Sequence, residues 1–394
     1  MHEIPADLTV RSDPYQLLRS IAQDGPVQQV LLRGRKIWLI TGYDEVTSGL
    51  SSQDLSNAPP LIDTEGQPGE RQGNLLFESL LATDPPVHTR LRRSVSDVFT
   101  ARRIERLKPR IEQITDALLD TIAPKGHADL MAEFAIPLPI TVICELLGIP
   151  DADRDAFRRW SIALVMPPAD PATLARAATA QADLARFFAE LIARKRTEPG
   201  DDLLTALALS SGDDRLSDRE LQAMAILLVL AGHETTANLI GTGALMLLRH
   251  PDQLAAIRDD PALLPGAVEE LARYAGPISL GVARFTRREV ELGGHLIPAG
   301  EMVMFALAAA SRDPGRYDRP DELDVNRAQR PHLAFGHGIH YCMGAPLARV
   351  EAAIALGGLV RRLPQLLLAI PEGRLVWRTA STRGLSELPV TFAH

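Results

Sequence analysis

The chain of 394 residues lacks the features that mark secreted, membrane-bound and nucleic-acid-binding proteins. Its two cysteines, Cys144 and Cys342, are too few for a disulfide framework, so we expect a reducing, cytoplasmic environment. The segment Met1 to Asp7 has no basic region, and the longest apolar run, Ala223 to Leu230, is too short to cross a bilayer. The net charge of −8 argues against nucleic acid and anionic membranes as partners.

Aromatic residues make up only 5% of the chain, and Ala and Leu are abundant, which favours helices over sheet. Two stretches predict β-strands instead. Val27 to Thr41 alternates around Arg33-Gly34-Arg35 and predicts a hairpin, followed by a short helix from Asp44. Val290 to Val303 predicts a β meander. The composition therefore predicts a mainly α protein with a small β region, and its length alone suggests two or three domains.

The stretch Phe335 to Gly344 predicts a tight loop beneath a flat ligand, because its glycines let the backbone turn sharply and approach closely. A helix follows, with Pro346 in its first turn, so Cys342 lies just before a helix N-terminus. Free N–H groups and the helix dipole there favour a thiolate over a thiol. A thiolate is what an iron ligand requires, and among haem ligands it is the one that favours O–O cleavage. Cys144, in an apolar stretch, is expected to serve packing alone.

A second stretch, Ser217 to Arg249, predicts a helix of roughly 50 Å that opens with a capping box and ends before Pro251. Its middle reads Ala231-Gly232-His233-Glu234-Thr235-Thr236. Small and β-branched residues weaken the helix there, and Thr235 is placed to compete for the carbonyl of Ala231. We therefore expect a locally widened turn with room for a diatomic ligand, and an acid at an apolar helix centre is a functional candidate.

Pairs of polar residues at helical spacing complete the pattern. His88 and Arg92 are four residues apart and share one helix face, from which both could bind a carboxylate. Glu270 and Arg273 are three apart and can form an ion pair. From Arg90 to Arg110 the chain has eight basic and two acidic residues, a surface that could attract an acidic electron carrier.

The loop around Cys342 resembles the haem-binding signature of the cytochromes P450 in their soluble bacterial form. Phenylalanine stands seven residues before the cysteine, glycine four before, histidine two before and glycine two after. The His-x-x-x-Arg pair, the central helix motif and the Glu-x-x-Arg pair occur in the family's order. The resemblance runs from about Asp13 to the end. It implies one domain over residues 1–394, with a long central helix over haem and the cysteine loop beneath it.

The resemblance also implies the site. Cys342 is the expected axial ligand of haem b, and Glu234 and Thr235 the expected proton relay for O2. The other expected cofactor contacts are His88, Arg92, Arg284, His340, Phe335, Gly336 and Ala231. The family often has an arginine and an aromatic residue that complete the Glu270-Arg273 network; Glu322 and Leu323 stand there instead, which makes Arg327 the expected third partner.

The implied reaction inserts one oxygen atom of O2 into a hydrophobic substrate by hydroxylation or epoxidation. Electrons would come from NAD(P)H through ferredoxin and ferredoxin reductase, and we expect a monomer. The substrate is expected to be a natural product such as a macrolide or other polyketide, contacted by Asn57 to Leu81, Phe157 to Arg196 and Ile278 to Val282.

Other functions stay open at this stage. A peroxide-driven peroxygenase, a non-hydroxylating oxidase or a carbon skeleton rearranger would share the fold, although peroxide users often lack the acid and alcohol of Glu234 and Thr235. A non-catalytic haem-binding sensor would need the cysteine loop without that pair. A cysteine hydrolase could use His340 as its base, but it would leave Arg284 and the acid-threonine helix without a role.

Overall fold

The computed structural model describes residues 2–5, 15–58, 75–96, 99–165, 171–212, 215–328, 331–378 and 382–393. Four long helices dominate it: α4 (Ala101–Ile122), α7 (Pro171–Thr197), α9 (Asp218–Arg249) and α13 (Ala345–Arg362). The shorter helices are α1 (Tyr15–Gln23), α2 (Tyr43–Ser51), α3 (Val87–Ser96), α5 (Pro137–Leu146), α6 (Arg154–Val165), α8 (Leu203–Ala208), α10 (Pro251–Asp259), α11 (Leu264–Ala275) and α12 (Leu307–Ala310).

The strands form three sheets at the edges of this helical body. The largest has the order β1-β2-β3-β9-β6-β4, from β1 (His2–Ile4), β2 (Val27–Leu32), β3 (Arg35–Ile40), β9 (Met302–Phe305), β6 (Val282–Thr286) and β4 (Leu55–Ser56). A second has the order β10-β11-β5, from β10 (Leu367–Leu368), β11 (Pro389–Thr391) and β5 (His127–Asp129). The third pairs β7 (Val290–Leu292) with β8 (His295–Ile297). The predicted mainly α fold is confirmed.

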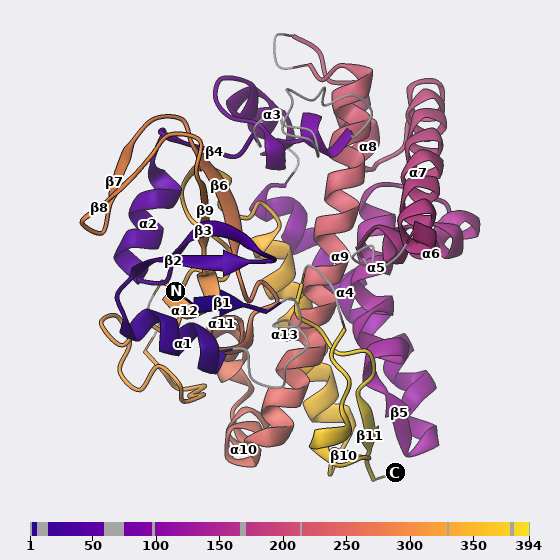
Figure 1. The fold of residues 1–394 in the computed structure, drawn as a ribbon. Coiled ribbons are helices and arrows are strands. Elements are labelled where there is room, and N and C mark those ends of the chain that lie inside the picture. The colour runs from indigo at the N-terminus through magenta and orange to yellow at the C-terminus, as the bar shows by residue number, and fades with distance from the viewer. Residues whose placement is uncertain are drawn as a thin grey trace.

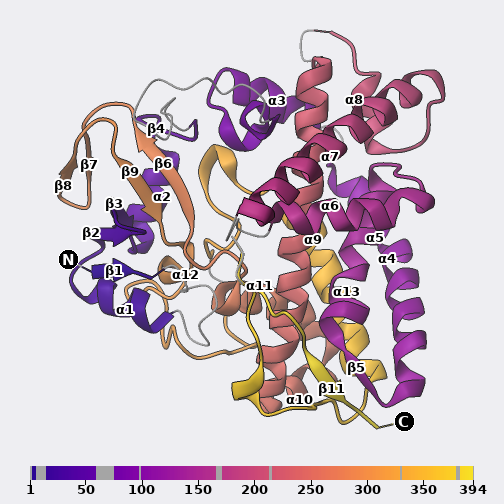
Figure 2. The same ribbon diagram turned by 45° about the vertical axis from the view of Figure 1, so that its right-hand side comes forward.

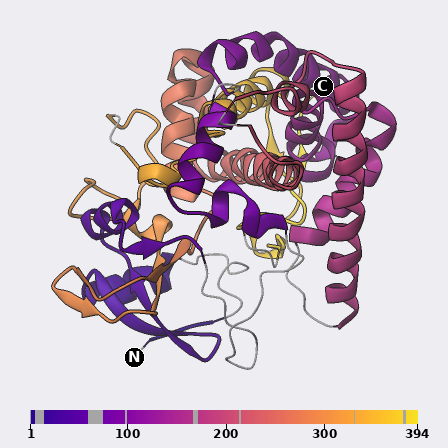
Figure 3. The ribbon, with the colours of Figure 1, turned by 90° about the horizontal axis from the view of Figure 1, so that it is seen from above.

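Helix α9 runs through the middle of the molecule, with the large sheet on one side and helices α4 to α8 on the other (Figures 1 and 2). Seen from above, α9 lies end-on inside a ring of other elements (Figure 3). Ser217 caps it, because its side chain accepts from the N–H of Glu220 while Glu220 reaches back to the N–H of Ser217. The predicted capping box and the predicted end of the helix at Arg249 are both confirmed.

By length and composition α9 could span a membrane, and among the described helices it alone passes that test. Two thirds of its most apolar window is buried inside the protein, as expected for the core helix of a globular fold. Its side chains join one large apolar cluster with α4, α5, α7, α11 and α13. Phe134, Phe157 and Phe188 are among the largest fully buried side chains of that cluster. The core therefore fixes α9 rigidly.

The N-terminal hairpin and the strands after β6 agree with the sequence predictions to different degrees. The hairpin of β2 and β3 is confirmed, and the helix expected from Asp44 begins at Tyr43. The predicted meander is wrong in part, because β7 and β8 pair only with each other while β9 lies between β3 and β6. Between α2 and α3 the chain forms the short strand β4 and two 3-10 turns, Leu75–Glu78 and Leu80–Ala82. Residues 59–74 lie outside the described part.

Candidate functional site

The loop that contains Cys342 is a tight, internally bonded turn. The N–H of Cys342 donates to the carbonyl of Phe335 over 2.9 Å. Gly336 and Gly338 have φ angles of +73° and +71°, which side chains with a Cβ rarely adopt. A Cβ at Gly338 would also lie 2.7 Å from the carbonyl oxygen of Leu50. The predicted sharp turn is confirmed, and the predicted close approach to a flat ligand stays a prediction.

Arg349 on α13 ties this loop to α11. Its Nε and Nη2 atoms donate to the carboxylate of Glu269 over 2.6 and 2.8 Å. Its Nη1 atom donates to the Tyr341 hydroxyl over 3.1 Å, and its guanidinium lies 4.4 Å from the centre of the Phe335 ring. Burial would raise the pKa of Glu269, but hydrogen bonds from His332 and Arg349 lower it to about 2. A charged pair therefore fixes both ends of the cysteine loop.

The Cys342 side chain is exposed, although the loop is held among helices. Helix α13 begins at Ala345 with a proline in its first turn, as predicted. The N–H groups of Gly344 and Ala345 favour the thiolate, as predicted, although desolvation by the protein packed around the loop is the larger influence and raises the pKa of Cys342. A bound metal cation would stabilise the thiolate further.

Beside this sulfur the structure gathers nitrogen-bearing side chains from three elements. His88 on α3 and His340 on the loop have ring centres 4.1 Å apart. Arg92, one turn after His88, donates to the carbonyl of Tyr341 over 2.9 Å. Arg284 on β6 is 7% exposed and acts electrostatically on both histidines. The four residues predicted for carboxylate binding therefore lie in one region.

The carboxylate that acts electrostatically on this group, that of Asp84, is itself ion-paired with Arg287 over 2.7 Å. Among the described residues, neither Arg92 nor Arg284 forms an ion pair, and burial lowers the pKa of Arg284 to about 10. Burial also lowers the pKa of His88 to about 4, and its Nε2 atom is buried without a hydrogen-bond partner. Buried donors without partners are costly, so a ligand with carboxylate groups fits them. Haem, which has two propionates, satisfies this requirement.

On α9, one face of the predicted motif is left open. Ala231 is exposed and Thr235, one turn later, is half-buried. The Thr235 hydroxyl donates to the carbonyl of Ala231 over 2.7 Å, as predicted. The helix is nevertheless continuous α-helix from Asp218 to Arg249, so the expected widened turn is not seen. The small Ala231 side chain alone leaves space on this face.

Glu234 points elsewhere. It is 6% exposed, and its Oε1 atom accepts a hydrogen bond from the Thr382 hydroxyl over 2.8 Å. Burial raises the pKa of Glu234, while that bond and the charge of Arg378 lower it. The sequence reasoning missed Thr382 and Arg378 because they lie more than 140 positions away in the chain. No local pattern could have found them.

The Glu-x-x-Arg network is present. Glu270 and Arg273 form a two-bond ion pair of 2.7 and 2.8 Å, with both side chains almost fully buried. Arg327 donates to Glu270 over 3.1 Å, so the expected third partner is confirmed. At the position where the family often has an arginine, the backbone carbonyl of Glu322 accepts a hydrogen bond from Arg273. The residue there thus joins the network through its backbone.

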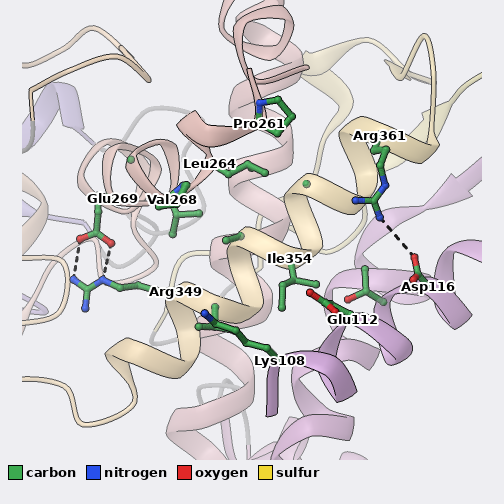
Figure 4. A pocket seen from close by; sticks show the side chains of 16 residues that line it. Lys108, Glu112, Asp116, Pro261, Leu264, Val268, Glu269, Arg349, Ile354 and Arg361 are labelled. Carbon is green, nitrogen blue, oxygen red and sulfur yellow. Dashed lines mark hydrogen bonds and ion pairs between the residues drawn. The ribbon is translucent and has the colours of Figure 1, made fainter. Parts of the chain in front are cut away.

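A separate cavity lies away from this site. It has a volume of about 960 Å³ and lies between α4, α11 and α13 (Figure 4). Figure 4 shows the Glu269–Arg349 pair at one end and Arg361 beside Asp116 at the other. None of the predicted site residues lines it, so this cavity is not the site described above.

Comparison with known proteins decides the family. The family model named Cytochrome P450 matches residues 153–367. Cytochrome P450 107B1 of Saccharopolyspora erythraea is 50% identical over 93% of this chain and 92% of its own length. The chain belongs to the cytochrome P450 family.

Two further relatives agree with this. The cytochrome P450 monooxygenase PikC of Streptomyces venezuelae is 47% identical over 96% of this P450 and 91% of its own length. The tirandamycin C-bound P450 monooxygenase TamI has a TM-score of 0.90 and 42% identity, with all of both chains covered. This P450 is therefore an oxidoreductase of the monooxygenase type that uses haem, O2, a small substrate and redox partners.

Proposed function

We propose that this P450 hydroxylates or epoxidises a hydrophobic natural product of the macrolide or polyketide kind, with Cys342 as the ligand of haem b. The observation that carries the cofactor assignment is the group of His88, Arg92, Arg284 and His340 beside an exposed cysteine, in which the buried His88 Nε2 atom has no hydrogen-bond partner and neither arginine forms an ion pair among the described residues. When bound, the haem supplies the iron at which O2 is reduced. We also propose that residues 1–394 form one domain and that the protein is a monomer in the cytoplasm.

The chain's own residues have separate tasks in this mechanism. The two arginines and His88 would hold the propionates by hydrogen bonds that compensate their burial. Phe335 and Gly336 shape the turn that would present Cys342 to the cofactor, and Ala231 leaves space on the open face of α9. Thr235 presents a hydroxyl on that face, and the carboxyl of Glu234, one residue away, would pass on a proton.

The electrons are proposed to come from NAD(P)H through ferredoxin and ferredoxin reductase. Arg93, Arg102 and Arg106 are exposed on α3 and α4, which carry the basic stretch predicted to face an acidic carrier. Part of that stretch is neutralised, since Arg90 pairs with Glu220 and Arg110 with Glu145. The surface charge is therefore concentrated at the start of α4.

The substrate proposal is supported by the names of the relatives. The 6-deoxyerythronolide B hydroxylase of Saccharopolyspora erythraea is 44% identical over 96% of this chain, and the mycinamicin IV hydroxylase/epoxidase of Micromonospora griseorubida is 42% identical over 91%. One of the three segments predicted to contact substrate is Ile278 to Val282, which the structure describes throughout. Ile278 and Val282 there are partly buried and apolar, as a hydrophobic substrate requires.

Spectral titration tests this proposal directly. 6-Deoxyerythronolide B, mycinamicin IV, tirandamycin C and, as a fatty-acid control, myristic acid are added to the ferric enzyme. At least one of the first three should shift the Soret band to shorter wavelength and yield a product one oxygen atom heavier with NADPH, ferredoxin and reductase. Product formed with hydrogen peroxide alone, and none with NADPH, would show the peroxygenase alternative to be correct.

A further inference from the structure

The carboxylate of Glu234 is held by a chain of hydrogen bonds from a distant part of the sequence. Arg378 Nη2 donates to Asn238 Oδ1 over 2.6 Å, Asn238 Nδ2 donates to Thr382 Oγ1 over 3.0 Å, and the Thr382 hydroxyl donates to Glu234 Oε1 over 2.8 Å. Asn238 follows Glu234 by one helical turn, so both side chains leave the same face of α9. Arg378 and Thr382 belong to the C-terminal hairpin that Trp377 and Leu385 close.

Arg378 determines which group donates and which accepts in every hydrogen bond of this series. A guanidinium can only donate, so the Asn238 atom facing Arg378 is the carbonyl oxygen. The amide nitrogen of Asn238 must then face Thr382 and donate to it. The Thr382 oxygen already accepts this bond, and its single proton is therefore directed to Glu234. Arg378 thus fixes the orientation of all the groups that follow it.

Packing holds the chain in place. Asn238 is 0% exposed and Thr382 is 7% exposed, so water does not compete for their hydrogen bonds. The hairpin approaches α9 so closely at Gly384 that a Cβ there would lie 2.0 Å from Asn238 Oδ1. The N–H of Arg383 anchors the same hairpin by donating to the carbonyl of Pro277 over 2.7 Å. The chain of hydrogen bonds from Arg378 to Glu234 is therefore held in place by the packing of buried side chains.

We propose that Arg378, Asn238 and Thr382 are positioning residues that keep Glu234 Oε1 as a hydrogen-bond acceptor and leave Oε2 as the oxygen that holds and hands over the proton. This inference rests on the proposed proton-delivering role of Glu234. Among the described groups acting on Glu234, Arg378 is the charged one, at 3.8 Å from Oε1. His233, the neighbour in sequence, is buried and bonds the Val229 carbonyl; burial lowers its pKa to about 4, so it is neutral at pH 7.

Infrared difference spectroscopy of the haem-loaded enzyme tests the positioning without depending on turnover. A protonated Glu234 gives a carbonyl stretch that Glu234→Gln removes, which assigns the band and separates it from other buried acids. Because Thr382 donates to the carbonyl oxygen, Thr382→Val should shift this band to higher wavenumber, and Thr382→Ser should restore its position. The spectra are recorded as the pH is lowered until Glu234 is protonated. A Glu234 band that does not move in Thr382→Val would overturn the inference.

A second measurement separates the inference from the proposed function. With NADPH, O2, a ferredoxin and its reductase, Thr382→Val should raise the hydrogen peroxide released per NADPH about fivefold, the effect of one lost hydrogen bond. In the Glu234→Gln background the same substitution should add nothing, since it acts through Glu234. If Glu234→Gln itself leaves the peroxide yield unchanged, the proton-delivering role is wrong. If only Thr382→Val leaves it unchanged, the positioning inference alone is wrong.

Discussion

Glu270 and Arg273 form a two-bond ion pair inside the protein, with side chains that are 3% and 2% exposed. A second guanidinium, that of Arg327, donates to the same carboxylate. One buried acid thus balances the buried Arg273 and the largely buried Arg327, while backbone carbonyls of Ser311, Pro320 and Glu322 accept the remaining donors of Arg273. The network joins α11 to the segment that precedes the cysteine loop.

Glu270→Leu should destabilise the protein strongly, because it leaves two largely buried positive charges without an acid. We expect a loss of about 3–5 kcal/mol in the free energy of unfolding, measured by urea titration with the haem absorbance as a second probe. Glu322→Gln is the matched control, since the Glu322 carboxylate is exposed and pairs only with exposed Arg319. That control should lose less than about 1 kcal/mol. Equal losses in the two variants would contradict the account of the network.

Glu351→Gln should change how stability depends on pH. Glu351 on α13 is 2% exposed, its Oε2 atom has no hydrogen-bond partner, and burial raises its pKa to about 8. Between its ordinary value of 4.5 and 8, the folded protein binds a proton that the unfolded chain has lost, so stability falls as pH rises through this window. The amide variant removes this slope and should be more stable at pH 8, on the order of 1–3 kcal/mol.

Thermal unfolding at pH 5 and pH 8 checks the Glu351 prediction. The two proteins should differ far less at pH 5, because Glu351 is neutral in the folded state and pH 5 lies only half a unit above its ordinary pKa of 4.5, so ionisation stabilises the unfolded chain little. A variant whose advantage is the same at both pH values would show that Glu351 is charged in the native protein or does not titrate.

Thr235→Ala should divert electrons to hydrogen peroxide, because it removes the hydroxyl on the open face of α9. Thr236→Ala is the matched control. Thr236 also donates to a carbonyl four residues earlier, that of Gly232, but it is only 3% exposed. Peroxide per NADPH consumed should rise about tenfold in the first variant and little in the second, as expected for the loss of one proton-transfer group. If both variants behave alike, Thr235 has no special role.

The double variant Arg102→Glu and Arg106→Glu should slow reduction by ferredoxin. Both side chains are exposed on α4, and no ion pair is recorded for either within the described residues. Reversing two charges should lower the association rate about tenfold at low ionic strength, with a smaller effect at high salt. Arg258→Glu on α10 changes an exposed arginine outside the basic stretch and serves as the control. Stopped-flow reduction under CO measures all three proteins.

The sequence predicted the elements that local chemistry determines. The capping box at Ser217, the glycine-dependent turn before Cys342 and the Glu270–Arg273 pair all depend on residues within one or two helical turns. Contacts between distant segments were not predictable in the same way. The bond from Thr382 to Glu234 spans 148 positions, and the placement of β9 between β3 and β6 depends on how three separate segments pair.

Cys342 shows the same limit. The sequence predicted that N–H groups at a helix N-terminus favour the thiolate, and those of Gly344 and Ala345 act in that direction. It could not show how far the protein packed around the loop would remove solvent and raise the pKa of the thiol. Desolvation depends on the assembled fold, and so does the net direction of the pKa shift.

The ligand assignment is tested most directly by exchanging the two cysteines separately. Cys342 is exposed beside the group of His88, Arg92, Arg284 and His340, whereas Cys144 is buried in the apolar core, where burial raises its pKa to about 12. The reduced, CO-bound Cys144→Ser protein should keep the red-shifted Soret band of a thiolate-ligated haem, and Cys342→Ser should lose it. A Cys342→Ser protein that binds haem and retains this band would contradict the account, since the iron ligand would then have to be another residue.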